Sequence, residues 1–186
     1  MKILINSNYS LCGGIAREAK ELENFVKENP FYELVTVTFN SQGFFDKFVD
    51  KNVTNYVINI PRDIIDKRIY SGLRDLEGAR KRFDPLISKI EKIIQSEKVD
   101  ISIVQGTYYI PWCLFQASQE TSTPIILKYS GILYKEEENR SSEIRNFFFK
   151  FESSFNRPNI FTIFPSELTK NTVERLFGPL NYPFVI

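Results

Sequence analysis

The sequence contains no histidine, and this absence excludes a large part of enzyme chemistry within the chain. Without an imidazole, the chain can hold neither a Ser–His–Asp triad nor a His-ligated metal ion. Cysteine is nearly as scarce, with only Cys12 and Cys113. Two cysteines make neither a disulfide framework nor, alone, a zinc site. We therefore expect two reduced thiols in a cytoplasmic protein, and no bound metal.

An excess of charge of either sign is also missing. The 24 basic and 23 acidic residues give a net charge of +1, whereas nucleic-acid binders usually carry a clear basic excess, so we expect no nucleic-acid partner. Long apolar runs are absent too. The apolar run at the N-terminus is too short for a signal peptide, and no later run approaches the length of about 18 residues that a membrane span needs.

The composition that is present belongs to a globular protein. Hydrophobic residues make up 42% of the 186 residues and charged residues 25%. That length fits a single domain, since domains run to roughly 100–200 residues. Aromatic residues reach 15%, including 17 Phe, and most of them must pack in a core.

Short apolar or β-branched runs alternate with segments of helical periodicity along the whole chain. We predict strands near residues 2–6, 34–39, 53–60, 101–104, 125–128, 161–164 and 183–186. Helices are predicted from Ile15 to Asn29-Pro30, in two pieces between residues 62 and 98 with the second starting at Asp84-Pro85, over 111–119 and 144–155, and from Pro165-Ser166-Glu167 to Gly178-Pro179. This alternation predicts an α/β fold: a Rossmann-like, doubly wound, mostly parallel sheet flanked by helices.

Ligands of such sheets bind beyond the carboxyl ends of the strands, where three loops are of interest. The first loop ends in Gly13-Gly14 just before a helix, whose free N–H groups suit a phosphate, although a tight turn would also need small residues. No complete dinucleotide or P-loop motif accompanies it.

The other two loops carry hydroxyl groups. Thr107, Tyr108 and Tyr109 offer hydroxyls and aromatic faces suited to a sugar, or rings that pack on a neighbour. Ser130-Gly131 offers a hydroxyl and a backbone amide, or a plain turn. Ser130 is not expected to be a nucleophile, because no histidine can activate it and no G-x-S-x-G elbow surrounds it.

The run from Phe147 to Phe151 allows two interpretations. Most of its rings share one helical face with Ile144 and Phe155. A helix that covers a sheet needs such a stripe, so we favour core packing over peripheral membrane contact. Phe149 lies off that face.

Four segments of the chain together resemble the family 4 glycosyltransferases, which have the GT-B fold. Residues 1–7 with Gly13-Gly14-Ile15 resemble the family's opening strand and glycine-rich helix start. Residues 99–106 are similar to its P-D-V-V-H-x-H segment, 123–131 to I-P-V-V-x-T-x-H-G, and 161–170 to D-x-V-I-A-V-S-E-x-x-K. The four segments follow in the family's order and are distributed along nearly the whole chain.

The resemblance implies the acceptor-binding half of an enzyme that moves a sugar from a nucleotide-sugar to an unknown acceptor. Residues 1–186 would form one N-terminal domain of a GT-B fold, inactive alone because the C-terminal donor-binding domain is absent. The nucleotide-sugar would be a co-substrate, with no cofactor or metal. The implied donor-phosphate site is Gly13, Gly14 and Ile15, and the implied acceptor site is Gly106, Thr107, Tyr108, Ser130 and Gly131.

Two departures from the family pattern leave other functions open. The family often has histidine at the position of Ser130 and near Gln105, and this chain lacks both, so no catalytic residue is assigned. The alternative is a stand-alone nucleotide- or partner-binding module without catalysis. A small flavodoxin-like hydrolase or reductase is disfavoured, because the acid–base histidine and the dinucleotide motif are both missing.

Overall fold

The computed structural model describes residues 1–186 except 8–13, 41–52, 61–74, 108, 137–140 and 159. Seven strands form one sheet in the order β3-β2-β1-β4-β5-β6-β7, and every neighbouring pair is parallel. The strands are β1 (Lys2–Ser7), β2 (Glu33–Asn40), β3 (Thr54–Asn59), β4 (Ile101–Gln105), β5 (Ile125–Lys128), β6 (Phe161–Phe164) and β7 (Tyr182–Val185). The predicted doubly wound α/β fold is confirmed.

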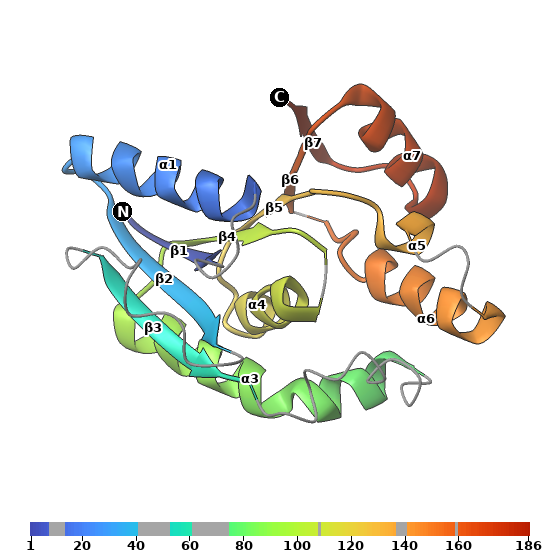
Figure 1. Cartoon of the computed structure of the whole chain (residues 1–186), viewed down its shortest axis with the longest axis horizontal. Helices are drawn as coiled ribbons and strands as arrows, with labels where there is room; N and C mark the ends of the chain where they lie inside the picture. The colour runs from blue at the N-terminus through green and yellow to red at the C-terminus, as the bar shows by residue number, and fades with distance from the viewer. Residues whose placement is uncertain (8–13, 41–52, 61–74, 108, 137–140, 159) are drawn as a thin grey trace.

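Helices lie on both faces of this sheet, as Figure 1 shows. They are α1 (Gly14–Glu28), α3 (Leu76–Glu97), α4 (Tyr109–Glu120), α5 (Leu133–Glu136), α6 (Ser142–Ser153) and α7 (Glu167–Phe177). On one face, Val26 of α1 packs with Ile3, Ile5 and Leu34 in a small cluster. The other face carries the large core, built from the apolar stripes of α3, α4 and α6. Alternation along β1 sends Leu4 to the large core and Ile5 to the small one.

Helix α3 corrects one boundary prediction. It runs unbroken from Leu76, so the predicted start at Asp84-Pro85 is wrong. Asp75 caps the helix, because its side chain accepts a 2.6 Å hydrogen bond from the backbone N–H of Gly78. Pro85 is tolerated inside because it is exposed, so water can reach the carbonyl of Lys81 that it leaves without a helical donor.

The phenylalanine run of α6 packs in the core, as predicted. Phe147, Phe148, Phe151 and Phe155 are all buried, and Phe151 stacks on Trp112 with 5.2 Å between ring centroids. Phe149, which lies off that face, packs instead between Tyr134 of α5 and Phe177 of α7. None of the helices, where the structure describes them, is long and apolar enough to cross a membrane.

Candidate functional site

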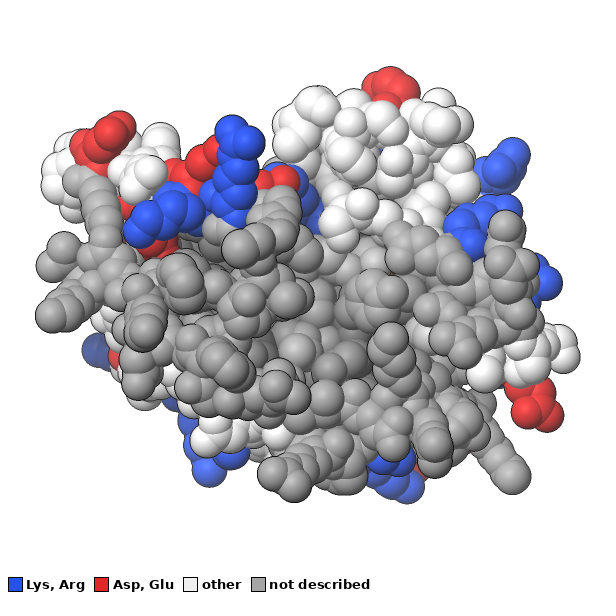
Figure 2. Space-filling model, in the orientation of Figure 1, with Lys and Arg blue, Asp and Glu red and all other residues white. Residues whose placement is uncertain are grey.

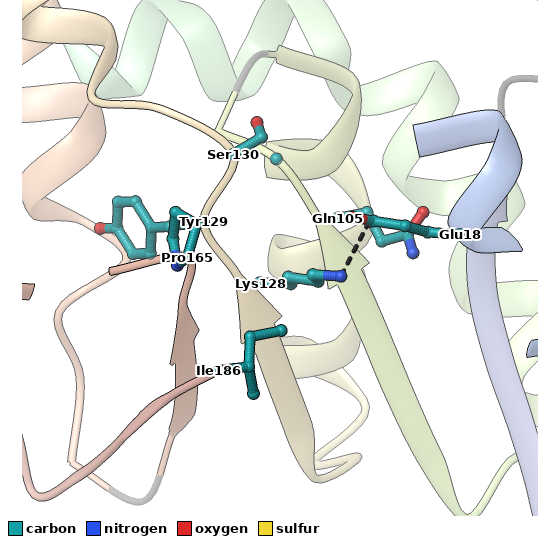
Figure 3. A pocket seen from close by; sticks show the side chains of 8 residues that line it. Glu18, Gln105, Lys128, Tyr129, Ser130, Pro165 and Ile186 are labelled. Atoms are coloured by element: carbon teal, nitrogen blue, oxygen red, sulfur yellow. Dashed lines mark ion pairs between the residues drawn. The ribbon is translucent and has the colours of Figure 1, made fainter. Parts of the chain in front are cut away.

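The carboxyl ends of β4, β5 and β6 meet beside the first turns of α1 and enclose a pocket of about 540 Å³. Because parallel strands deliver their following loops to the same edge, segments far apart in the sequence converge there. The lining residues are Glu18, Gln105, Gly106, Lys128, Tyr129, Ser130, Pro165 and Ile186. Figure 3 shows the side chains of Glu18, Gln105 and Lys128 grouped on one side and that of Ser130 above them. This pocket is the candidate functional site.

A buried side chain fixes the end of β4 at this site. The side-chain amide of Asn6 on β1 donates to the carbonyl of Gln105 at 3.1 Å, and the backbone N–H of Gln105 donates to the Asn6 side-chain oxygen at 2.8 Å. Both residues are buried. A reciprocal pair of hydrogen bonds between two strands holds both position and orientation, so the Gln105 side chain starts from a rigid backbone.

The side-chain oxygen of Gln105 is buried without a partner. Gln105 is only 4% exposed, and its Oε1 has no hydrogen-bond partner among the residues that the structure describes. An unmatched buried acceptor costs roughly 1–3 kcal/mol, and such groups are rare in folded proteins. Gln105 is also one of the residues that line the pocket, so its side-chain oxygen is a candidate acceptor for a ligand hydroxyl or N–H.

An ion pair crosses the pocket beside Gln105. Lys128 at the end of β5 lies 2.9 Å from the carboxylate of Glu18 on α1, and the dashed line in Figure 3 marks this contact. Both groups are partly exposed, so the pair is expected to contribute less than about 1 kcal/mol to folding. It joins α1 to the sheet at the pocket wall. An anionic ligand could reach Lys128 only in competition with Glu18.

The two loops predicted to bind the acceptor lie together. The Thr107 hydroxyl donates to the carbonyl of Gly131 at 3.4 Å, and the backbone N–H of Gly106 donates to the carbonyl of Lys128 at 2.8 Å. Gly106 has φ +85°, which favours glycine and lets the chain turn sharply at the end of β4. Gly106 and Ser130 line the pocket. Tyr108 lies outside the described residues, and so does the side chain of Tyr109.

The predicted donor-phosphate residues are placed only in part. Gly14 is the first residue of α1, and Ile15 follows it in the helix. Gly13 lies outside the described residues. The first turn of α1 carries no acidic residue, so the free N–H groups at its start keep their partial positive charge. Glu18, one turn along, lines the pocket.

Two buried groups support the loop that follows β5. The ring of Tyr129 stacks on Phe164 with centroids 5.0 Å apart, and burial raises the pKa of its phenol far above the usual range, so it stays protonated. The carboxylate of Glu152, buried in α6, accepts a 2.9 Å hydrogen bond from the backbone N–H of Tyr134. The segment carrying Ser130 and Gly131 is therefore anchored at both ends.

Reasoning from the sequence did not assign a role to Asn6, Glu18, Gln105 or Lys128. Asn6 and Gln105 stand at the two strand ends that open the predicted loops, and Lys128 is a charge at the end of an apolar strand. A polar residue at the carboxyl end of a buried strand is the signal that could have found them. Within the described part of the chain, no group of three or more Cys, Asp or Glu could hold a metal ion.

Comparison of the fold with solved structures finds GT-B glycosyltransferases and epimerases. Sucrose-phosphate synthase from Thermosynechococcus elongatus superposes with a TM-score of 0.69 at 12% identity, over 100% of this chain and 47% of that one. UDP-GlcNAc 2-epimerase from Methanocaldococcus jannaschii gives 0.56 at 19% identity, over 100% and 45%. UGT71G1 of Medicago truncatula, in complex with UDP-glucose, gives 0.59 at 11% identity, over 99% and 50%.

These similarities establish the fold. The chain matches the Rossmann-like half of GT-B proteins and spans about half the length of each neighbour. No family model matches the sequence, and none of the curated proteins matches it. Membership of glycosyltransferase family 4 therefore stays a prediction.

Proposed function

We propose that this chain is the acceptor-side half of a glycosyltransferase that transfers a sugar from a nucleotide-sugar to a hydroxyl-bearing acceptor. The observation that carries the proposal is the buried side-chain oxygen of Gln105, a residue that lines the pocket at the carboxyl edge of a GT-B-type sheet, because this oxygen has no hydrogen-bond partner among the described residues. Its fold neighbours include proteins named for the chemistry of nucleotide-sugars.

The pocket chemistry suits a polyol. Gln105 would accept a hydrogen bond from one acceptor hydroxyl, while Glu18 could accept from another and Lys128 could donate. Ser130 and the backbone around Gly106 and Gly131 would contact the rest of the acceptor. Several polar groups converging on a small space give a neutral ligand orientation as well as affinity.

The donor would approach from the side of α1. Gly13, Gly14 and Ile15 at the helix start would offer backbone N–H groups to the pyrophosphate, a contact favoured by roughly 0.3–1 kcal/mol for each charge near the helix end. Lys128 would assist if the donor phosphate displaced Glu18. The nucleotide-sugar is a co-substrate in this scheme, and no metal or further cofactor is required.

The chain alone is proposed to be inactive. A base for the acceptor hydroxyl cannot be a histidine, because the chain has none. Glu18 is a poor substitute while its carboxylate is paired with Lys128. The donor sugar and the missing acid–base groups would come from a C-terminal half.

Ligand-observed NMR on the 186-residue chain tests this proposal. Saturation transfer should appear for methyl glycosides and disappear in Gln105→Leu, while the matched exposed variant Gln119→Leu should leave it unchanged. UDP-glucose incubated with the chain should yield no more free UDP than a protein-free control. Turnover by the isolated chain, or equal saturation transfer in both variants, would contradict the proposal that the chain is an acceptor-binding half that is inactive alone.

A stand-alone binding module remains the second candidate, favoured by the absence of histidine and by the ion pair that already occupies Lys128. The gene discriminates between the two. A reading frame that continues past Ile186 into a second Rossmann-like domain with an E-x7-E pair supports the transferase. A stop codon at that point supports the module.

A further inference from the structure

Two charged side chains stand in the pocket wall at positions where the folding pattern calls for apolar ones. On α1, Glu18 lies four and eight residues before Leu22 and Val26, which pack in the small cluster on the sheet. Residues four apart share a helical face, so Glu18 also faces the sheet. Lys128 ends the otherwise apolar strand β5. The periodicity that builds the core explains neither charge, so each is a candidate for a role toward a ligand.

The register of the sheet directs Lys128 toward α1. Ile103 of β4 packs against the small cluster on the α1 side, and Gln105 lies two residues further along that strand. Side chains two apart on a strand share a face, and so do paired residues of neighbouring parallel strands. Gln105 pairs with Lys128 of β5, and Figure 3 shows both side chains grouped with Glu18. Lys128 Nζ and Glu18 Oε2 therefore meet at the pocket wall, 2.9 Å apart.

This ion pair leaves hydrogen-bonding capacity on both partners. An ammonium group has three N–H donors and a carboxylate has two acceptor oxygens, and the contact between them occupies one of each. Within the described residues, neither side chain has a further hydrogen-bond or ionic partner. The Lys128 side chain is 23% exposed and that of Glu18 39%, so a ligand can reach both. A donor that is available to a ligand therefore stands next to an available acceptor.

Such a donor–acceptor pair matches two hydroxyl groups on adjacent carbon atoms. In the gauche arrangement, the two hydroxyl oxygens lie about one hydrogen-bond length apart, as Lys128 Nζ and Glu18 Oε2 do. One hydroxyl would donate to the carboxylate while its neighbour accepts from the ammonium group, and the two charges would stay paired. A single hydroxyl, or two hydroxyls on carbons further apart, would make only one of these two hydrogen bonds.

The same geometry disfavours charged ligands. A phosphate or carboxylate that binds Lys128 must displace Glu18 or be repelled by it, and an amine meets the same obstacle at Lys128. Figure 2 shows basic and acidic side chains side by side over α1, so no field of one sign attracts either kind of ligand beside the pocket. The pair accordingly favours a neutral ligand.

Away from the ion pair, the pocket wall is apolar. Pro165 and Ile186 line the pocket on the side away from Glu18 in Figure 3. A pyranose ring has the same two-sided character, with hydroxyl groups around its edge and C–H groups on its faces. The volume of about 540 Å³ falls within the range of roughly 300–1,000 Å³ that is typical of small-molecule sites. One sugar ring can therefore contact both kinds of wall.

We propose that Lys128 and Glu18 together determine the specificity of this pocket, and that they select neutral acceptors with hydroxyl groups on two adjacent carbons, as in an unsubstituted hexopyranoside. That the ligand is an acceptor rests on the proposed function. Both residues bind the ligand and neither takes a proton from it. A purely structural ion pair, which only joins α1 to the sheet, would have no effect on the choice of ligand, and this difference is what the experiments measure.

The first experiment compares three isomeric probes by titrating each into the 186-residue chain and following amide chemical shifts. Methyl 2-deoxyglucopyranoside and its 4-deoxy isomer each keep one adjacent pair of hydroxyls, whereas the 3-deoxy isomer keeps as many hydroxyls but none that are adjacent. We expect the 3-deoxy isomer to bind about tenfold more weakly than the other two, because it loses one of the two charge-assisted hydrogen bonds. Methyl glucopyranoside 6-phosphate should bind no more tightly than methyl glucopyranoside itself.

The second experiment changes the ion pair. Glu18→Gln leaves the Lys128 charge without its partner, so methyl glucopyranoside should bind about tenfold more weakly, and its 6-phosphate more tightly, than in the wild-type chain. Glu21→Gln is the matched control, because it removes a carboxylate that pairs with Arg17 on an exposed part of the same helix. The control should leave both affinities unchanged. Circular dichroism establishes that the two variants are folded.

Three results would overturn this proposal alone. They are equal affinity for the three deoxy isomers, tighter binding of the 6-phosphate by the wild-type chain, and an effect of Glu18→Gln no larger than that of Glu21→Gln. Each of them leaves the proposed function standing, because the chain would still bind a glycoside. Binding of none of the probes would instead overturn the proposed function together with this inference. The two failures are therefore distinguishable.

Discussion

The two faces of the sheet differ in how completely the described helices cover them. On one face, α3, α4 and α6 bury Leu4, Val104, Leu127 and Phe164, so that every strand from β1 to β6 contributes to a dry core. On the other face, α1 covers only the residues around β1, and the exposed fraction of the side chains rises toward β7. We expect the face covered by α3, α4 and α6 to contribute most of the hydrophobic stabilisation of the fold. On the α1 side of β6 and β7, by contrast, Phe161, Tyr182 and Phe184 are exposed, and polar groups line the pocket at the carboxyl edge.

This contrast predicts its largest effect in a pair of matched substitutions. Phe151→Ala empties a fully buried site against Trp112 and Phe155, and should lower the free energy of unfolding by about 3–5 kcal/mol. Phe184→Ala removes the same ring from β7, where it is 53% exposed, and should cost less than about 1 kcal/mol. Urea unfolding of both variants measures the difference. A similar cost for the two would mean that the Phe184 ring is buried in solution.

The second effect concerns the end of β4, which the Asn6 side chain holds by two hydrogen bonds. Asn6→Leu keeps the number and branching of the side-chain heavy atoms but leaves the Gln105 backbone N–H and carbonyl without their Asn6 partners. We expect a loss of about 2–3 kcal/mol in the free energy of unfolding, because both groups are buried. The same substitution at the exposed Asn59 serves as the control and should cost much less. A loss no greater at Asn6 than at Asn59 would show that the strand ends are held by the sheet alone.

Most of the fold could be predicted from the sequence because it depends on local patterns. Apolar runs such as Ile101–Val104 and the stripe of Leu86, Ile87 and Ile90 specify a buried strand and a covering helix by periodicity alone. The start of α3 could not be predicted, because the tolerance of Pro85 depends on its exposure in the folded chain.

The position of the candidate site could be predicted from the sequence, but its side-chain contacts could not. Loops after parallel strands must share an edge, so the convergence of Thr107 and Gly131 was predictable. The partners Asn6–Gln105 and Lys128–Glu18 were not, because each depends on which strand or helix lies beside which. The exposure of Phe184 likewise depends on strand order, because the residues of β7 do not specify which helix will lie beside them.

A third, smaller effect has the opposite sign. Gln105→Leu removes a buried oxygen that has no partner within the described part of the chain, and should raise the free energy of unfolding by about 1 kcal/mol while abolishing glycoside binding. Stability gained together with binding lost is the signature of a group retained for a ligand. Gln119→Leu, an exposed change, should affect neither property. A destabilised Gln105→Leu variant would show that the amide serves the fold.

The smallest effect is expected at the amino edge of the sheet, at the opposite ends of the strands from the pocket. Glu97 accepts hydrogen bonds from the Tyr56 hydroxyl and from Lys2 Nζ, the latter at 3.0 Å. The Tyr56 bond first, and then Lys2, hold the pKa of Glu97 below its ordinary value. Glu97→Gln should therefore lower the free energy of unfolding at pH 7, by less than about 1 kcal/mol since the cluster is near the surface.

The pH dependence gives this prediction its sign. A carboxyl with a lowered folded pKa stabilises the fold above its unfolded pKa of about 4.3, and this stability is lost as the pH falls through the folded value. The difference in the free energy of unfolding between the wild-type chain and Glu97→Gln should therefore be constant from roughly pH 6 to 8, because the carboxyl is ionised throughout that range. The difference should vanish in acid. Glu33, which pairs with the same Lys2 at 3.3 Å but is 73% exposed, provides the control. If Glu33→Gln lowers the free energy of unfolding as much as Glu97→Gln does, the charge of Lys2 alone explains the effect. The Tyr56–Glu97 hydrogen bond would then add nothing measurable.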